Sequence, residues 1–297
     1  MKYHFYTCDV FTDMPFGGNP LAVLPDAEGL SSQEMQQIAR EFNYSETTFV
    51  LPGTKGYTRN VRIFTPTQEI PFAGHPNIGT AFVLATTGEF GDIESEKEIV
   101  FKEKAGAVPI RIRKNAENTW CELKAPQDLS IGQTLPADLI ASTLSISPGN
   151  IITTTHKPQL ASVGLPFIMV QLADRSVLEL ISLNFPVFEE IHKMGIIPDI
   201  HVYTLVKDGF DIRTRMFAPL DGIPEDPATG SANCALAAML SHYKSEIDGN
   251  FSWHIAQGVE MRRPSVLDAR TEKKSGKVTG VWIAGNSRMI MQGTIEI

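Results

Sequence analysis

The stretch that decides the fold is Phe217-Ala-Pro-Leu-Asp-Gly-Ile-Pro-Glu-Asp-Pro-Ala-Thr-Gly-Ser-Ala-Asn-Cys-Ala-Leu-Ala-Ala-Met-Leu240. Three prolines and a glycine in its first half exclude regular structure, so we expect an irregular loop there. The run from Ala232 to Leu240 is small and apolar on nearly every face, which predicts a helix that is buried all round. Because a helix N-terminus carries unpaired N–H donors and a partial positive charge, the start of this helix is a natural seat for a carboxylate ligand.

A second stretch, Phe64-Thr-Pro-Thr-Gln-Glu-Ile-Pro-Phe-Ala-Gly-His-Pro-Asn-Ile-Gly79, has the same layout and also enters a small, apolar helix. Four residues recur at a constant offset of 217 − 64 = 153: Phe64, Pro66, Ile70 and Pro71 match Phe217, Pro219, Ile223 and Pro224. An offset of about half the chain indicates two related halves rather than a short-period solenoid.

Length and composition fit two globular domains, because the chain has 297 residues, of which 42% are hydrophobic and 20% charged. The net charge is −8 and no basic patch occurs, so nucleic acid is not an expected partner. The first residues alternate like a strand and lack the features of a signal peptide. No uncharged run approaches the roughly 20 residues of a membrane helix. The three widely spaced cysteines fit buried thiols in a reducing compartment. We therefore expect a cytoplasmic protein that does not bind membranes.

The remaining pattern predicts an α+β fold. Ser31 and Glu34 form a capping box for a helix that stops near Asn43. Strands are expected at 3–10, 21–24, 48–51, 61–64, 98–102, 108–113, 151–155, 167–172, 201–206, 213–217, 252–257, 276–284 and 288–297, and further helices at 135–144, 177–183 and 187–194. Their irregular alternation favours curved, mixed sheets over a doubly wound parallel sheet. The polar stretch 114–119 predicts domains at 1–117 and 118–297, with the last strand near 288–297 able to pack back onto the first domain.

Two residues of the first half are candidates for proton transfer. Glu46 lies just before an apolar strand. Its neighbours Phe42, Tyr44 and Phe49 could shield the carboxylate and raise its pKa, as general acid–base catalysis at neutral pH requires. The alternative is an exposed acid at the start of a strand. His75 lies just before the first apolar helix, where it could donate a hydrogen bond to a substrate or transfer a proton, or could be a capping or core histidine.

Asp226 and Ser231 lie at the start of the second apolar helix. Each has an ordinary alternative, because Asp226 could cap a turn and Ser231 could be a helix N-cap. A nucleophilic serine is not indicated, since Gly230-Ser231-Ala232 does not match Gly-x-Ser-x-Gly. The sequence has no dinucleotide-binding or phosphate-binding glycine motif, and its histidines and cysteines are not grouped as metal ligands. We therefore expect neither a cofactor nor a metal.

Together these stretches resemble the phenazine-biosynthesis PhzF-like family, which is related to diaminopimelate epimerase. The matching pieces run in family order from near residue 9 to near residue 294, so the resemblance covers the whole chain. They include Asp9-Val-Phe-Thr12, Phe16-Gly-Gly-Asn-Pro20, Ser45-Glu46-Thr-Thr-Phe49, Ile63-Phe-Thr-Pro66, Ile70-Pro-Phe-Ala-Gly-His-Pro76, Arg215-Met-Phe-Ala-Pro219, Glu225-Asp-Pro-Ala-Thr-Gly-Ser-Ala232, Gln257-Gly258 and Arg263-Pro-Ser265.

The resemblance implies two similar domains, each a curved sheet wrapped around a central helix, with the active site in a cleft between them. It also implies catalytic roles for Glu46 as the general acid–base and for His75 and Asp226. Substrate-binding roles fall on residues in the matching motifs: Asn19, Ser45, Gly74, Gly230 and Ser231. The two cysteines that the epimerases use at the helix starts are absent, which disfavours racemisation by two thiols.

These implications give one functional prediction and one alternative. We predict a cofactor-independent isomerase that moves a proton between carbons of a small carboxylated, cyclic metabolite, similar to the isomerisation of a dihydro-hydroxyanthranilate by the phenazine enzyme. The motifs support proton transfer more firmly than any named substrate. The alternative is a non-catalytic protein that keeps the family fold and binds a metabolite or a protein partner. The resemblance also suggests a homodimer.

Overall fold

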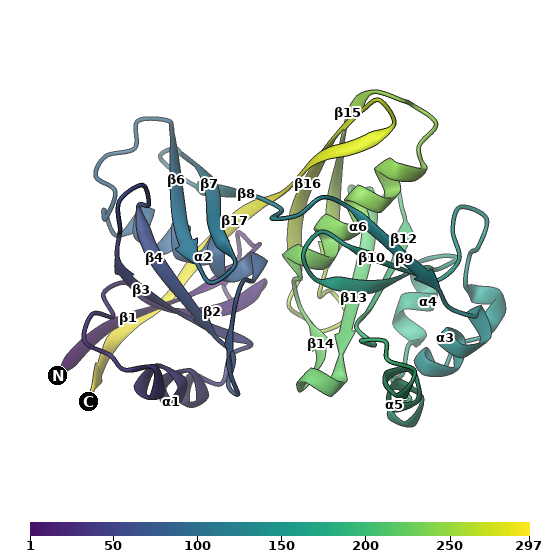
Figure 1. Cartoon of the computed structure of the whole chain (residues 1–297), viewed down its shortest axis with the longest axis horizontal. Coiled ribbons are helices and arrows are strands. Elements are labelled where there is room, and N and C mark those ends of the chain that lie inside the picture. Colours follow the sequence, from purple (N-terminus) through teal and green to yellow (C-terminus); the bar gives the residue numbers. More distant parts are fainter. The chain divides into compact units, whose positions relative to one another are not determined.

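The computed structural model describes all 297 residues and divides the chain into two compact units. Unit 1 comprises Met1–Lys124 together with Ala284–Ile297, and unit 2 comprises Ala125–Ile283 (Figure 1). The boundary therefore follows residue 124 instead of 117, because 114–119 is mostly the turn between two paired strands of unit 1. The return of the C-terminal residues to unit 1 comes from one long strand, β17 (Lys277–Glu296), that contributes to both units.

Unit 1 is a ring of strands around one helix. Its elements are β1 (Lys2–Val10), β2 (Asn19–Leu24), α1 (Ser32–Phe42), β3 (Glu46–Pro52), β4 (Arg59–Phe64), β5 (Glu69–Ile70), α2 (Gly74–Thr86), β6 (Glu96–Glu103), β7 (Gly106–Lys114) and β8 (Thr119–Lys124). Strand β1 pairs antiparallel with β17 and β2, β2 parallel with β3, and β3 antiparallel with β4. The order continues with β4 parallel to β6, then β6, β7 and β8 antiparallel in turn, and the pairing of β8 with β17 closes the ring.

Helix α2 lies inside this ring, where it contacts β1, β2, β3, β7 and β8 (Figure 1). Every residue from Gly74 to Ala85 is buried, as expected for a helix that is apolar on all faces. Gly79 allows close approach to the strands, because a Cβ there would come within 2.6 Å of Leu21 and 2.7 Å of Val10. Helix α1 covers the outside of the ring instead, and it has the predicted capping box of Ser31 and Glu34.

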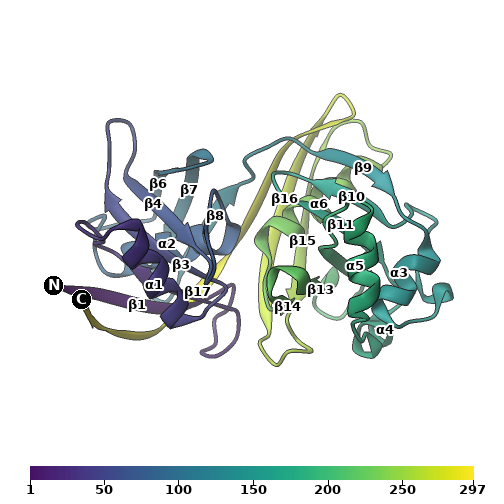
Figure 2. The same cartoon turned by 60° about the horizontal axis from the view of Figure 1, so that its bottom comes forward.

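Unit 2 repeats this plan with more helices outside. Its elements are β9 (Ser130–Thr134), α3 (Ala137–Leu144), η1 (Pro148–Asn150), β10 (Gln159–Ser162), β11 (Pro166–Gln171), α4 (Arg175–Leu180), α5 (Phe185–Lys193), β12 (Ile200–Leu205), β13 (Ile212–Ala218), η2 (Pro219–Asp221), β14 (Ile223–Asp226), α6 (Gly230–Tyr243), β15 (Gly249–Gln257) and β16 (Ser265–Lys274). Helices α3, α4 and α5 share a core with the outer face of β11, β12 and β13 (Figure 2). The central helix is α6, which contacts β10, β11, β15 and β16.

The strand pairing of unit 2 has the same order of directions as that of unit 1. From β10 to β11, β12, β13, β15 and β16 the pairs are antiparallel, parallel, antiparallel, parallel and antiparallel, as from β1 to β2, β3, β4, β6 and β7. The register also matches, because Thr47 faces Phe64 in unit 1 and Ile200 faces Phe217 in unit 2, with 200 − 47 = 153. The predicted duplication and the fold of two similar, curved mixed sheets around central helices are therefore confirmed.

Two local expectations were wrong or incomplete. The segment 151–155 is not a strand, since only Ile151 makes an isolated bridge, to Leu172. Six strands were not predicted: β5, β8, β9, β10, β14 and β16. All but β16 have at most six residues, and each is fixed by its pairing with other strands. None of the helices combines the length and the hydropathy that crossing a bilayer requires.

Candidate active site

The first polar cluster lies at the N-terminus of α2 in unit 1. The helix begins at Gly74, and its N-cap residue, Ala73, offers no side chain to the first-turn N–H groups. His75 and Pro76 follow, and proline is tolerated in this first turn because its missing N–H is not needed there. The imidazole of His75 is buried, with 6% of its side chain exposed. The local sequence thus places a histidine, instead of a capping hydroxyl, at the open end of a buried helix.

A chain of polar contacts fixes the orientation of His75. The Ser45 hydroxyl lies 3.3 Å from Asn19 Oδ1, and Asn19 Nδ2 lies 3.3 Å from His75 Nδ1. Asn19 therefore presents its NH₂ group to the imidazole, which makes Nδ1 the acceptor and leaves the proton on Nε2. His75 Nε2 lies 3.4 Å from Glu46 Oε2, a close contact that lacks the geometry of a hydrogen bond. Glu46 and Ser45 are adjacent in the sequence, and this contact completes a ring of four side chains.

Burial determines the charge state of His75. It lowers the pKa of the imidazole to about 3, so His75 is neutral throughout the physiological range. The ordinary pKa near 6.5 that would suit a proton shuttle does not apply at this position. A neutral imidazole with its proton on Nε2 has instead a hydrogen-bond donor to offer.

Glu46 opens β3 and keeps 13% of its side chain exposed. The sequence predicted that aromatic neighbours shield the Glu46 carboxylate, but two of them pack elsewhere. Phe49 packs edge to face on Phe64 in the core beneath α1, and Phe42 packs against the same core. Because side chains alternate along a strand, Phe49 points to the face of β3 opposite Glu46. The carboxylate therefore has the imidazole of His75 as its neighbour on the inner face.

The second polar cluster lies at the N-terminus of α6 in unit 2. Asp226 ends β14 and is buried, and its Oδ2 accepts a hydrogen bond from the Thr229 hydroxyl. Gln257 fixes the intervening loop, because its Nε2 donates to Asp226 O at 2.8 Å and to Thr229 Oγ1 at 3.0 Å. Gln257 Oε1 accepts from Thr229 N at 3.1 Å and from Asn233 Nδ2 at 2.7 Å. Asp226 is thus held in one orientation by a loop whose polar groups are satisfied.

Ser231 does not cap α6, which corrects one of the alternatives drawn from the sequence. The N-cap residue is Thr229, whose side chain bonds to Asp226 and makes no capping hydrogen bond. Ser231 is the second helical residue and is half-buried, as His75 is the second residue of α2. Gly230 corresponds in the same way to Gly74. Both central helices therefore begin without a side-chain cap, and their first-turn N–H groups suit a carboxylate.

The local sequence identified Glu46, His75, Asp226 and Ser231, but it did not reveal what holds them. Thr229 and Gln257 were present in the quoted motifs without a role, because their contacts depend on how β15 pairs with β13. A polar residue at the end of the apolar run Ile255–Gln257 was the only local signal. The three cysteines are buried and unpaired, and burial raises the pKa of each thiol, so none is a ready nucleophile.

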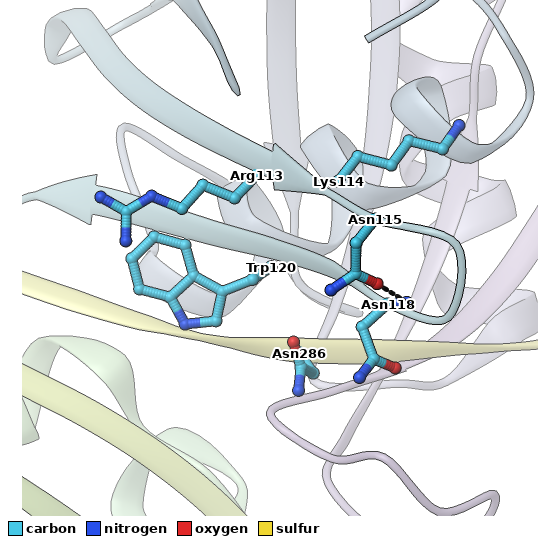
Figure 3. Close-up of a pocket in the computed structure, with 6 residues that line it drawn as sticks. All are labelled: Arg113, Lys114, Asn115, Asn118, Trp120 and Asn286. Carbon is cyan, nitrogen blue, oxygen red and sulfur yellow. Dashed lines mark hydrogen bonds between the residues drawn. The ribbon is translucent and has the colours of Figure 1, made fainter. Parts of the chain in front are cut away.

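Unit 1 also has a surface pocket of about 400 Å³ near the turn between β7 and β8 (Figure 3). In it the guanidinium of Arg113 lies over the ring of Trp120, and Asn286 of β17 lies opposite the turn. Lys114 donates to the carbonyl of Ala85, near the C-terminal end of α2. The pocket is therefore at the other end of α2 from His75 and is separate from the polar cluster.

Comparison with known proteins gives consistent results over the whole chain. The family model PhzC-PhzF, phenazine biosynthesis-like protein, matches residues 8–293. The chain is 34% identical over 294 residues to trans-2,3-dihydro-3-hydroxyanthranilate isomerase of Pseudomonas aeruginosa, covering 98% of each chain. It is also 34% identical over 299 residues to an uncharacterized isomerase of Mesorhizobium japonicum, covering 97% of each. A phenazine biosynthesis protein of the PhzF family from Bacillus anthracis has a similar structure, with a TM-score of 0.89, 25% identity and 100% coverage of both chains.

Proposed function

Because the chain belongs to the phenazine biosynthesis-like PhzC-PhzF family, we propose that it moves a proton between two carbon atoms of a small, cyclic carboxylate without a cofactor. The family is a family of isomerases, and this chain is an isomerase. The relatives named for trans-2,3-dihydro-3-hydroxyanthranilate support a substrate of that chemical class, a ring that carries a carboxylate next to exchangeable C–H bonds.

The observation that carries this proposal is the contact between Glu46 and His75, whose Oε2 and Nε2 atoms are 3.4 Å apart. Glu46 removes a proton from one carbon and returns it to another. The neutral His75 keeps its proton and offers its Nε2–H as a hydrogen-bond donor to the substrate oxygen that develops negative charge. One group therefore performs both proton transfers, since an imidazole with a pKa of about 3 holds no second proton to deliver near neutral pH.

The residues at the two helix starts serve binding in this proposal. In each unit, the uncapped first turn of the central helix, which begins at Gly74 or at Gly230, offers N–H groups to a carboxylate. Ser231 and the carboxylate of Asp226 bind hydroxyl or amino groups of the substrate. Asn19 and Ser45 act through His75, because their contacts fix its tautomer.

Replacement of Glu46 by glutamine tests the assignment. Glu46→Gln keeps the shape of the side chain but removes the base, so turnover is expected to fall by about 10²–10⁴-fold. The thermal midpoint should barely change, because Glu46 is only partly buried and is not part of a hydrophobic core. His75→Asn should reduce turnover less than Glu46→Gln. A folded Glu46→Gln variant with full activity on trans-2,3-dihydro-3-hydroxyanthranilate would remove Glu46 from the mechanism.

Running the reaction in heavy water tests the one-base scheme. A single base returns the proton on the same face of the ring from which it was taken, with deuterium incorporated to the extent that water exchanges with Glu46. NMR of the product locates the deuterium and its face. Delivery to the opposite face that is lost in His75→Asn would contradict the scheme and make His75 a second acid. Binding of the compound with no turnover in any condition would favour a non-catalytic role.

A further inference from the structure

Glu103 and Gln257 occupy equivalent positions in the two units. Glu103 ends β6 and Gln257 ends β15, and these strands have matching registers with their neighbours. Arg59 faces Phe101 between β4 and β6, and Ile212 faces Ile255 between β13 and β15. Counting two residues onward from Phe101 and from Ile255 gives Glu103 and Gln257.

The helix residues that face these two positions are also equivalent. Asn77 and Asn233 are each the fourth residue of a central helix. Asn77 Nδ2 donates to the carbonyl of the N-cap residue Ala73 at 2.9 Å, and Asn233 Nδ2 donates to the carbonyl of Thr229 at 3.0 Å. In unit 2 the same Nδ2 group also donates to Gln257 at 2.7 Å. The two units therefore share an arrangement of strand end, asparagine and N-cap, with a glutamate in one and a glutamine in the other.

An amide suits this position because it both donates and accepts. Gln257 uses both functions, as its four hydrogen bonds to the loop and to Asn233 demonstrate. An ionised carboxylate can only accept, whereas a protonated carboxyl group has one O–H donor and one C=O acceptor. Only the protonated form of Glu103 can therefore both donate and accept, as Gln257 does.

The surroundings of Glu103 favour that form. The residue is 7% exposed, and burial raises the pKa of its carboxyl group to about 8. The Asn77 side chain lies beside it, slightly outside ordinary hydrogen-bond geometry, and opposes part of this rise. Asn77 Oδ1 and both carboxyl oxygens lack a partner at such geometry, and an O–H on Glu103 directed at Asn77 Oδ1 would satisfy two of these atoms.

The charged groups around Glu103 do not neutralise it. Lys104 pairs with Glu69 of β5 at 2.7 Å, and Lys102 lies over the ring of Tyr57. Glu69 is held ionised by Arg62 and Lys104, which lower the pKa of its carboxyl group. On the first turn of α2 the titratable group is His75, which is neutral. No cation is therefore placed to stabilise an ionised Glu103.

We propose that Glu103 is a positioning residue that works in its protonated form and holds Asn77 and the first turn of α2, and with them His75, as Gln257 holds the first turn of α6 and Asp226. The turn after Glu103 adds a second link, because Ala105 N donates to Pro71 O in the loop that leads into α2. Ionisation at alkaline pH puts a negative charge in this apolar site, and the helix start that carries His75 must shift to admit water. The activity part of this inference rests on the proposed function, whereas the ionisation and stability parts do not.

The test compares Glu103→Gln with the reciprocal change Gln257→Glu in the full-length protein. Infrared spectroscopy of the wild type should show a protonated carboxyl band that titrates near pH 8 and is absent from Glu103→Gln. A second band, from Asp199 of unit 2, whose pKa burial raises to about 7, should remain in the variant. The folded protein binds this proton up to about pH 8 while an unfolded glutamate releases it near 4.5, so stability falls as the pH rises through that window. Glu103→Gln should therefore have a thermal midpoint at least ~3 °C above the wild type at pH 8. Gln257→Glu should create the same alkaline decline in unit 2.

The activity profile separates positioning from a purely structural role. As the pH rises through about 8, the kcat of the wild type should fall by a larger factor than its KM rises. Glu103→Gln should not show this fall in kcat. Glu103→Ala should lower kcat at pH 7, and the glutamine variant should restore it. Glu117→Gln, on the exposed turn between β7 and β8, is the matched control and should change nothing. A carboxyl band titrating near pH 8 that persists in Glu103→Gln, or a glutamine variant less stable than the wild type at pH 8, overturns the proposal. If no substrate is turned over, the infrared and thermal measurements still decide it.

Discussion

Unit 1 should respond to acid through two buried groups that act in opposite directions. The perturbation is a change from pH 7 to pH 5. Burial lowers the pKa of His75 to about 3, whereas a histidine in the unfolded chain titrates near 6.5. Below pH 6.5 the unfolded state therefore binds a proton that the folded state refuses, so stability is lost as the pH falls. Glu103, with its pKa raised to about 8, is protonated in the folded protein, whereas a glutamate of the unfolded chain stays mostly ionised down to about pH 4.5. The folded state therefore binds the extra proton, and Glu103 adds stability over the same change.

The magnitudes follow from the unfolded pKa values, because neither group changes its protonation much in the folded protein between pH 5 and 7. At pH 5 the unfolded histidine is 6.5 − 5 = 1.5 pH units below its pKa, which at 1.36 kcal/mol per unit removes about 2 kcal/mol of stability. Glutamate is 7 − 4.5 = 2.5 units above its pKa at pH 7 and 5 − 4.5 = 0.5 units above it at pH 5. Glu103 therefore adds about 2.5 kcal/mol, and the two effects nearly cancel in the wild type.

The variants expose each effect separately. Between pH 7 and pH 5, the free energy of unfolding of His75→Asn should change about 2 kcal/mol more favourably than that of the wild type. This difference does not depend on how stable the variant is at pH 7. Urea unfolding of unit 1 can be followed through Trp120 in a background that replaces Trp253 and Trp282, which lie in unit 2. His4→Asn, at an exposed position of unit 1, is the control and should follow the wild type. If His75→Asn and the wild type change alike between the two pH values, His75 is not buried in its neutral form and the reasoning fails.

Other changes test packing, loop geometry and thiol burial. Gly79→Ala should lower the stability of unit 1 by about 1–3 kcal/mol, because its Cβ would meet Leu21 at 2.6 Å; a thermal midpoint equal to that of the wild type would show that the strands yield easily. Thr229→Val removes the hydroxyl that donates to Asp226, so the KM for the proposed substrate should rise more than kcat changes. An unchanged KM would contradict a role for Asp226 in substrate binding. The three cysteines should not react with a thiol reagent in the native protein and should all react in urea, as counted by absorbance; a rapid native reaction at any of them would contradict its burial.

Much of the fold was predictable because its signals are local. The constant offset between Phe64 and Phe217 predicted two related halves, and their matching strand registers confirm this. The capping box at Ser31 predicted the start of α1. The domain boundary was misplaced because β8 joins unit 1 through its pairing with β7 and β17 and its packing against α2, which the polar stretch 114–119 does not reveal.

For the candidate site, the sequence pointed to individual residues but not to their surroundings. Glu46 and His75 stand in short motifs, so a single sequence points to both. The neutral state of His75 was not predictable, because it results from burial inside a ring that closes only when β17 pairs with β1 and β8. The equivalence of Glu103 and Gln257 was also hidden, since the residues around them differ and only the pairing of β6 and β15 aligns them.

The path of β17 sets an order for folding during synthesis. Unit 2 is one continuous segment, Ala125–Ile283, so all of it is synthesised before the last residues of unit 1. Unit 1 begins to emerge first, but its ring lacks a strand until Ala284–Ile297 are made and pair with β1. Until then β1 and β8 present open edges, which invite pairing with other chains. The first unit to be started is thus the last to be completed, and a chain truncated after residue 283 should leave the ring of unit 1 open at β1 and β8 and expose His75.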